Sequence, residues 1–197
     1  MFGVHNANAT PIVLDFSTGT AGFGGGITVN GTNVTGTNIL IDHLTVIGAP
    51  ISGGFDVNGP GAPTPSSQGK TGVLNFNTAT NVISITGNIP SLGINSSIVL
   101  LNGTFSSFSV TKSGIILQVA AQGPDFKNPL LLKALKLPTN LKFEFFGFTI
   151  ASKLVGNNYK AFSTDIANTT NVPEPSSLLL LGLGVCFLGI IVRLNHQ

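Results

Sequence analysis

Asp42 and His43 form the only directly adjacent acid–base pair of the sequence, and such a pair could take part in hydrolysis. A hydrolase needs a nucleophile that a histidine and an acid orient. Serines are plentiful, but none stands at the centre of a Gly-x-Ser-x-Gly turn. Consecutive residues of a strand point to opposite faces of the sheet, so these two side chains make poor partners for each other. We therefore expect both to be structural surface residues.

Acidic residues outside the C-terminal tail could still pair in space, as the two carboxyl groups of a glycosidase do. They are Asp15, Asp42, Asp56, Asp125, Glu144 and Asp165. These are few for an enzyme, so a carbohydrate-active hydrolase is only a minor alternative. His5 and His196 stand near the two ends, and Cys186 is the only cysteine, so the sequence offers no cluster of metal ligands and no internal disulfide. We expect no enzymatic activity, no cofactor and no metal.

Two glycine-containing stretches match nucleotide-binding motifs only in part. Gly69-Lys70-Thr71 has the end of a phosphate-binding loop, but position 64 is threonine where that loop needs glycine. The stretch 22–26 begins like a dinucleotide fingerprint and then lacks its third glycine. Both stretches are better explained as turns or linkers.

Charged residues are scarce: 8% of the chain, against roughly 25% in typical soluble domains. Asn, Thr, Ser and Gly must then cover the surface, which is typical of an extracellular or cell-surface protein. The net charge of +2 is too small to attract nucleic acid strongly.

The lysines are unevenly distributed, with six of them against one glutamate over residues 127–160. They are Lys127, Lys133, Lys136, Lys142, Lys153 and Lys160, and the acid is Glu144. One interpretation is a solubilising lysine fringe on a nearly neutral domain. The other is a patch for an anionic polymer or a membrane surface.

Short apolar or β-branched runs, separated by Gly, Asn, Pro and Ser, predict an all-β domain. The alternation over residues 141–150 changes phase at Phe145 and Phe146, which indicates a bulge or a strand buried on both faces. Residues 59–72, with their Pro, Gly and Ser, predict a surface loop. The predicted strands are 12–16, 36–48, 73–76, 82–89, 96–110, 114–121, 141–150 and 159–166.

Only residues 129–137 have a helical pattern. Asn128 can cap the helix, Pro129 suits its first position, and Pro138 would end it. Short, regularly spaced strands favour a single β-sandwich-like domain over a β-solenoid, because no fixed repeat period is present. The fold class predicted is therefore all-β, with one short helix.

The last part of the chain contains an uncharged apolar run, 178–192, that Arg193 follows. As a helix the run spans about 22 Å, less than the roughly 30 Å of a bilayer core. Ser176, Ser177 and the stem of Arg193 extend the span at its ends. We expect a transmembrane helix, with Arg193 as the membrane stop and the C-terminus in the cytoplasm.

Val172, Pro173, Glu174, Pro175 and Ser176 precede this run. Together with the Leu- and Gly-rich helix and the arginine after it, they resemble the PEP-CTERM sorting tail of exported bacterial proteins. In that family an exosortase, a membrane cysteine transpeptidase, cleaves near Pro-Glu-Pro and passes the protein to the cell surface or matrix. The resemblance implies that Pro173, Glu174 and Pro175 are recognition residues, which are features of a substrate and catalyse nothing.

The same resemblance implies a Gram-negative host that makes exopolysaccharide, with export and an inner-membrane anchor before processing. The leading function is then a non-catalytic protein of the cell surface or extracellular matrix, with the exosortase and the membrane as partners. The alternative is a lectin-like module that binds polysaccharide through phenylalanines, Tyr159 and the lysine-rich half. Six sequons for Asn glycosylation start at Asn8, Asn30, Asn33, Asn95, Asn102 and Asn168.

An exported protein needs a secretion signal, and Ala7 and Ala9 form a small-x-small cleavage site. We interpret residues 1–9 as the remnant of such a signal. The predicted organisation continues with a β-sandwich domain over 10–166, a linker with Pro-Glu-Pro over 167–175, and the membrane helix with its cytoplasmic end over 176–197.

Overall fold

The computed structural model describes residues 11–18, 24–63 and 70–170. These ranges form thirteen strands, one short 3₁₀ turn η1 and one α-helix. The first strands are β1 (Val13–Ser17), β2 (Gly24–Asn30), β3 (Asn33–Ile41), β4 (His43–Ile47), β5 (Gly53–Asp56) and β6 (Asn58–Pro63). They are followed by β7 (Lys70–Asn77), β8 (Val82–Ile89), η1 (Pro90–Leu92), β9 (Ile94–Thr104), β10 (Ser107–Ser113), β11 (Ile116–Lys127), α1 (Pro129–Ala134), β12 (Phe143–Val155) and β13 (Asn158–Thr169).

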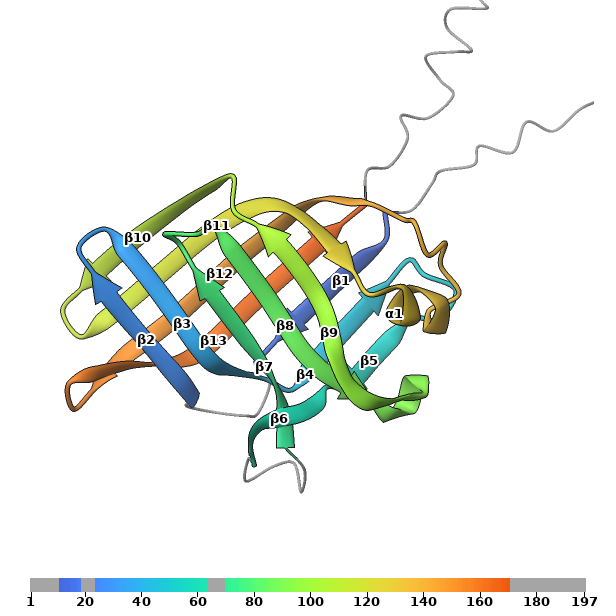
Figure 1. The fold of residues 1–197 in the computed structure, drawn as a ribbon, viewed down its shortest axis with the longest axis horizontal. Coiled ribbons are helices and arrows are strands. Elements are labelled where there is room, and N and C mark those ends of the chain that lie inside the picture. The colour runs from blue at the N-terminus through green and yellow to red at the C-terminus, as the bar shows by residue number, and fades with distance from the viewer. Residues whose placement is uncertain (1–10, 19–23, 64–69, 171–197) are drawn as a thin grey trace, which may run out of the picture. The chain divides into compact units, whose positions relative to one another are not determined.

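The strands form two layers that cross each other (Figure 1). The front layer contains β2, β3, β7, β8 and β9, and the rear layer contains β10, β11, β12, β13, β1, β4 and β5. Strand pairing also joins the layers, because β9 pairs with β11 and β13 pairs with β2. The predicted all-β class with one short helix is confirmed. The two layers belong to one continuous sheet, because both edge strands of the front layer, β9 and β2, pair with strands of the rear layer.

The chain passes from the front layer to the rear layer at Asp42. β3 pairs with β2 and β7 in front, whereas β4 pairs with β1 and β5 behind. At this corner the Asp42 N–H donates to Ser17 O (3.3 Å), and Asp42 O accepts from Val57 N (2.9 Å). The prediction of one strand over 36–48 was therefore wrong, because the apolar pattern continues through a residue where the backbone changes sheets.

A second crossover divides the predicted strand 96–110 into β9 and β10. At this break Phe105 N donates to Asn81 O and Ser106 N donates to Gln122 O, each over 2.8 Å. Glycine at position 123 is required here, because a Cβ would lie 1.9 Å from Thr104 O. Phe105 anchors the break by packing its ring into the core against Phe76, Phe146 and Phe148.

Two further predictions near strand ends have different outcomes. The predicted loop over 59–72 contributes to β6 and β7 at its two ends, so that prediction was wrong for these residues. The predicted irregularity near Phe145 is confirmed, because Gly123 pairs with Phe146 while Asp125 pairs with Phe143. β12 therefore has one more residue than β11 between these two pairs, which is a β-bulge.

Helix α1 begins as the sequence predicts and ends earlier. The Asn128 side chain accepts from Leu130 N (2.9 Å), and Pro129 occupies the first turn. Lys136 takes a left-handed conformation (φ 57°), and Leu137 N donates to Leu132 O (2.8 Å). This closing turn ends the helix before Pro138 is reached. The buried leucines Leu131, Leu132, Leu135 and Leu137 place α1 and its closing turn against one end of the core (Figure 1).

Candidate functional site

The residues predicted to act in sorting lie outside the described ranges. They are Ala7, Ala9, Val172, Pro173, Glu174, Pro175, Ser176 and Arg193, together with the membrane helix predicted over 176–192. Among the described residues, no helix is both long enough and apolar enough to cross a membrane.

His43 belongs to a polar row that crosses four strands on the outer surface of the rear layer. Ser17 of β1 lies opposite Asp165 of β13 on one side and opposite His43 of β4 on the other. His43 in turn lies opposite Asp56 of β5. Asp15 is two residues from Ser17 and therefore projects from the same face. Strand pairing thus gathers residues that are far apart in the sequence into one surface.

Asp15 and Asp165 form a hydrogen-bonded carboxyl pair within this surface. The pKa of Asp15 is raised to about 6, first by burial and then by the hydrogen bond and charge repulsion of Asp165. The charge of His43 and a hydrogen bond from the Ile166 backbone lower the pKa and oppose these effects. Asp15 Oδ1 is buried, with no hydrogen-bond partner in the described part of the chain. The pair can therefore share a proton, as closely placed carboxyl groups do.

The arrangement around His43 does not resemble a working hydrolytic site. A Cβ on Gly54 would lie 2.9 Å from His43 Cε1 and 3.0 Å from its Nε2, so the imidazole leans over β5. To act as a general base for Ser17, the imidazole would instead have to contact the Ser17 hydroxyl group on β1.

A second ionisable pair, Asp125 and Lys127, lies inside the domain. Lys127 Nζ is 2.6 Å from Asp125 Oδ2, and both side chains are fully buried. Lys127 Nζ also lies 4.4 Å from the centre of the Phe143 ring. Burial lowers the pKa of Lys127 to about 8, although the Asp125 carboxylate opposes that shift. Burial likewise raises the pKa of Asp125, and Lys127 opposes it.

The buried position of Lys127 shows that its assignment to the predicted lysine fringe was wrong. Residues 117–127 alternate between buried and exposed, and Lys127 falls on the buried side. It therefore cannot solubilise the surface or bind an anionic polymer. Tyr159 is also poorly suited to stacking on a sugar, because its hydroxyl is buried and Lys112 Nζ lies 5.8 Å from its ring centre.

Asn168 cannot act as a glycosylation site in this fold. Its residue is fully buried, and its Nδ2 donates to Leu14 O (2.8 Å) and Ile166 O (3.0 Å). A glycan on this nitrogen would break both hydrogen bonds. Asn30, Asn33, Asn95 and Asn102 are exposed.

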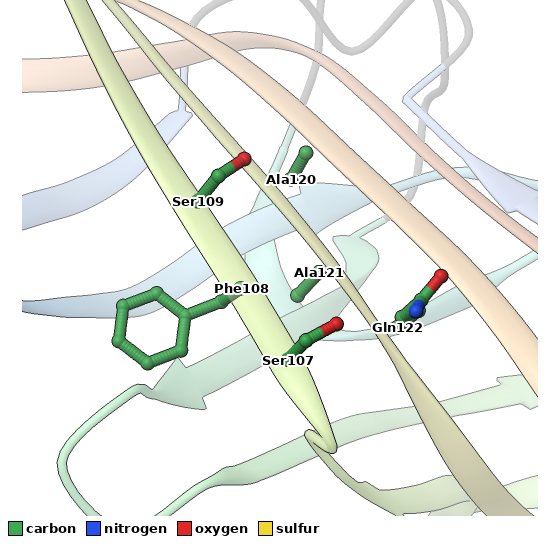
Figure 2. Close-up of a pocket in the computed structure, with 6 residues that line it drawn as sticks. All are labelled: Ser107, Phe108, Ser109, Ala120, Ala121 and Gln122. Atoms are coloured by element: carbon green, nitrogen blue, oxygen red, sulfur yellow. The ribbon is translucent and has the colours of Figure 1, made fainter.

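A shallow hollow lies at the edge of the rear layer, between β10 and β11 (Figure 2). Ser107, Ser109 and Gln122 project to one side of it, and Phe108 projects to the other. Its side chains are small or uncharged, so it offers hydrogen bonds without a catalytic group. In the described ranges, no group of three or more His, Cys, Asp or Glu residues could hold a metal ion.

Comparison with known proteins identifies the segment beyond the β domain. Residues 171–194 match the family model of the PEP-CTERM protein-sorting motif. No curated protein and no solved structure matches the chain. The matched range covers Val172–Ser176 and Arg193, the residues on which the sequence resemblance rests. Residues 171–194 are therefore a PEP-CTERM sorting motif, which indicates an exported protein that an exosortase processes.

Proposed function

We propose that this chain is a non-catalytic protein of the cell surface or extracellular matrix, which an exosortase releases from the inner membrane by cleavage near Pro173-Glu174-Pro175. The observation that carries this proposal is the sorting motif over residues 171–194. Before processing, the apolar run after the motif anchors the chain in the membrane. After processing, the all-β domain reaches the surface or the matrix.

The geometry of the acidic groups supports a non-catalytic role. Asp15 and Asp165 bond to each other, and the imidazole of His43 leans over β5. The remaining pair, Asp125 and Lys127, is buried in the core. A structural or binding role needs no such groups and fits a surface made largely of amides and hydroxyls.

The proposal predicts different outcomes for two changes in the tail. Replacing Pro173, Glu174 and Pro175 together by alanine should leave membrane insertion intact, because the apolar run is unchanged. It should abolish cleavage, because the extended and charged recognition element is lost. Replacing Leu183→Lys should instead weaken the anchor, because a charge at a helix centre costs roughly 2.5–3.5 kcal/mol on insertion.

Mass spectrometry of the C-terminus, in hosts with and without an exosortase, tests both changes. The wild-type chain should lose its end only where the exosortase is present. The triple alanine variant should keep Gln197 in the membrane fraction, and the Leu183→Lys variant should appear uncleaved outside that fraction. A wild-type chain that keeps Gln197 in both hosts would show that the tail is only an anchor.

A second candidate function is polysaccharide binding, and the front layer favours it. Four of its five strands, β2, β3, β8 and β9, contain no Asp, Glu, Lys, Arg or His, and β7 contains only Lys70, at its start. Their outward side chains include hydroxyl and amide groups, which are suited to hydrogen bonding with sugar hydroxyls. This surface differs from the lysine-rich and aromatic one that the sequence suggested.

A further inference from the structure

The front layer contains a shallow hollow over β3, β7 and β8, and uncharged side chains line it. No residue of this lining carries a charge, although the rear layer presents three aspartates and a histidine. The lining consists of Thr35, Gly36, Thr37, Asn75, Phe76, Asn77, Thr80, Val82 and Ser84.

Asn75 is fixed at this hollow by an irregularity in β3. The pairing of β3 with β7 shifts between Gly36 and Ile39, and Asn38 takes a left-handed conformation (φ 53°). The N–H of Asn38 donates to Asn75 Oδ1 over 2.9 Å. A backbone N–H can only donate, so the amide oxygen must face it and the Nδ2 group must point elsewhere.

Asn77 is fixed in the same way by the turn after β7. Its Oδ1 accepts from Ala79 N over 2.8 Å. Within the described ranges, Nδ2 of neither Asn75 nor Asn77 donates to a protein group. The two residues lie on one face of β7, about 6.5–7 Å apart along the strand. The hollow therefore presents two oriented amide donors.

Hydroxyl groups and carbon atoms complete the surface between these donors. Thr35 lies opposite Asn77 on β3, and Ser84 lies opposite Asn75 on β8. Val82, which is 41% exposed, forms an apolar wall beside Asn77. A pyranose ring has the matching character, with hydroxyl groups at its rim and C–H groups on its faces.

We propose that this hollow is a binding site for a neutral polysaccharide chain. The absence of charge in its lining is the complementarity that selects this ligand. An anionic polymer would lose hydration there without gaining an opposite charge, whereas a neutral one exchanges its water for the amide and hydroxyl groups. This inference deepens the second candidate function. It rests on export only because export would bring the domain to the polysaccharide.

Binding of the full chain, purified in mild detergent, to immobilised polymers tests the proposal. The probes are dextran, laminarin and galactomannan as neutral polymers and alginate as an anionic one, measured by biolayer interferometry. Asn75→Asp and Asn77→Asp each keep the oxygen that accepts the backbone N–H and replace the amide donor by an acceptor. Asn158→Asp, at the exposed start of β13, adds the same charge away from the hollow and is the matched control.

We expect at least one neutral polymer to bind better than alginate. Asn75→Asp and Asn77→Asp should each weaken that binding about three- to tenfold, and Asn158→Asp should leave it unchanged. Thermal melting checks that the variants fold. If Asn75→Asp does not fold, Ser84→Val, which removes a hydroxyl group from the same hollow, takes its place in the test. Failure to bind any neutral polymer, a preference for alginate, or equal binding by all variants would overturn the proposal. Sorting is measured separately, by mass spectrometry of the C-terminus. A failure of sorting can therefore be distinguished from a failure of polysaccharide binding.

Discussion

Two pairs of ionisable side chains in the described part of the domain are held together for opposite reasons. Asp125 and Lys127 carry opposite charges, stand two residues apart on β11 and are shielded from water in the core. Asp15 and Asp165 carry the same charge, come from two strands and lie on the partly exposed rear surface. The first pair depends on both charges being present, whereas the second depends on one carboxyl keeping its proton. A buried salt bridge is therefore sensitive to mutation, and a carboxyl pair is sensitive to pH.

Removing one charge from the core should have the largest effect. Lys127→Met leaves Asp125 buried without its partner, which should lower the free energy of unfolding by about 3–5 kcal/mol. Urea denaturation followed by circular dichroism measures the loss. The double variant Asp125→Val, Lys127→Met removes both charges and should recover most of the stability. A single variant as stable as the wild type would contradict the burial of the pair.

Changing the rear pair should have a smaller effect that depends on pH. The pKa of Asp15 is raised from 3.8 to about 6 in the folded state, so the folded protein binds this proton more tightly than the unfolded chain. Its stabilising contribution is complete below about pH 4 and is lost as the pH rises through about 6. Asn at position 15 keeps a neutral group beside Asp165 at every pH.

Melting temperatures of the wild type and Asp15→Asn between pH 4 and 7.5 test this expectation. The melting temperature of the variant should rise relative to that of the wild type as the pH increases from 4 to 6. At higher pH the difference between the two melting temperatures should stay constant. A difference that does not change with pH would show that the carboxyls do not share a proton. Asp56→Asn, on the same surface, controls for the removal of a negative charge.

The smallest effect should come from His43, which is a neighbour of the rear pair. The positive charge of His43 lowers the pKa of Asp15, so His43→Asn should raise that pKa above about 6. The shift should be a few tenths of a pH unit, because partly exposed charges are screened by solvent. Carbon-13 NMR titration of the Asp15 carboxyl measures it. A pKa that falls instead would mean that the histidine acts on Asp15 through its packing.

The sequence predicts the strands well where buried and exposed residues alternate within one sheet. It fails at Asp42 and at Phe105, because the apolar pattern continues while the backbone moves from one partner strand to another. The predicted strand 114–121 also stops too early, since β11 continues through Gly123 and Pro124 to Lys127. Pro124 in fact lies in β11 within the bulge between Gly123 and Asp125, where the ladder is already interrupted.

The two ionisable pairs differ in how far the sequence could reveal them. Asp125 and Lys127 continue the alternation of Leu117, Val119 and Ala121. The pattern therefore predicts their burial if the strand is extended to residue 127. Asp15 could be placed on an outer face because Leu14 and Phe16 flank it. Its partner Asp165 could not be named, because that contact depends on the pairing of the first strand with the last. The donors of Asn75 and Asn77 were missed because a bulge and a turn orient them.

The pairing of β1 with β13 also determines how the domain responds to force. Ile12 N donates to Thr170 Oγ1, and Thr170 N donates to Ile12 O, each over 3.1 Å. Tension that separates these two residues acts along the hydrogen bonds of an antiparallel ladder and opens them one at a time. Tension on Thr170 against a ligand held at the front layer does not pull on Ile12, and β13 passes the load to its three paired strands, β1, β12 and β2. A protein fixed in a matrix by its front layer would therefore resist a pull on its C-terminal side better than a pull between its two ends.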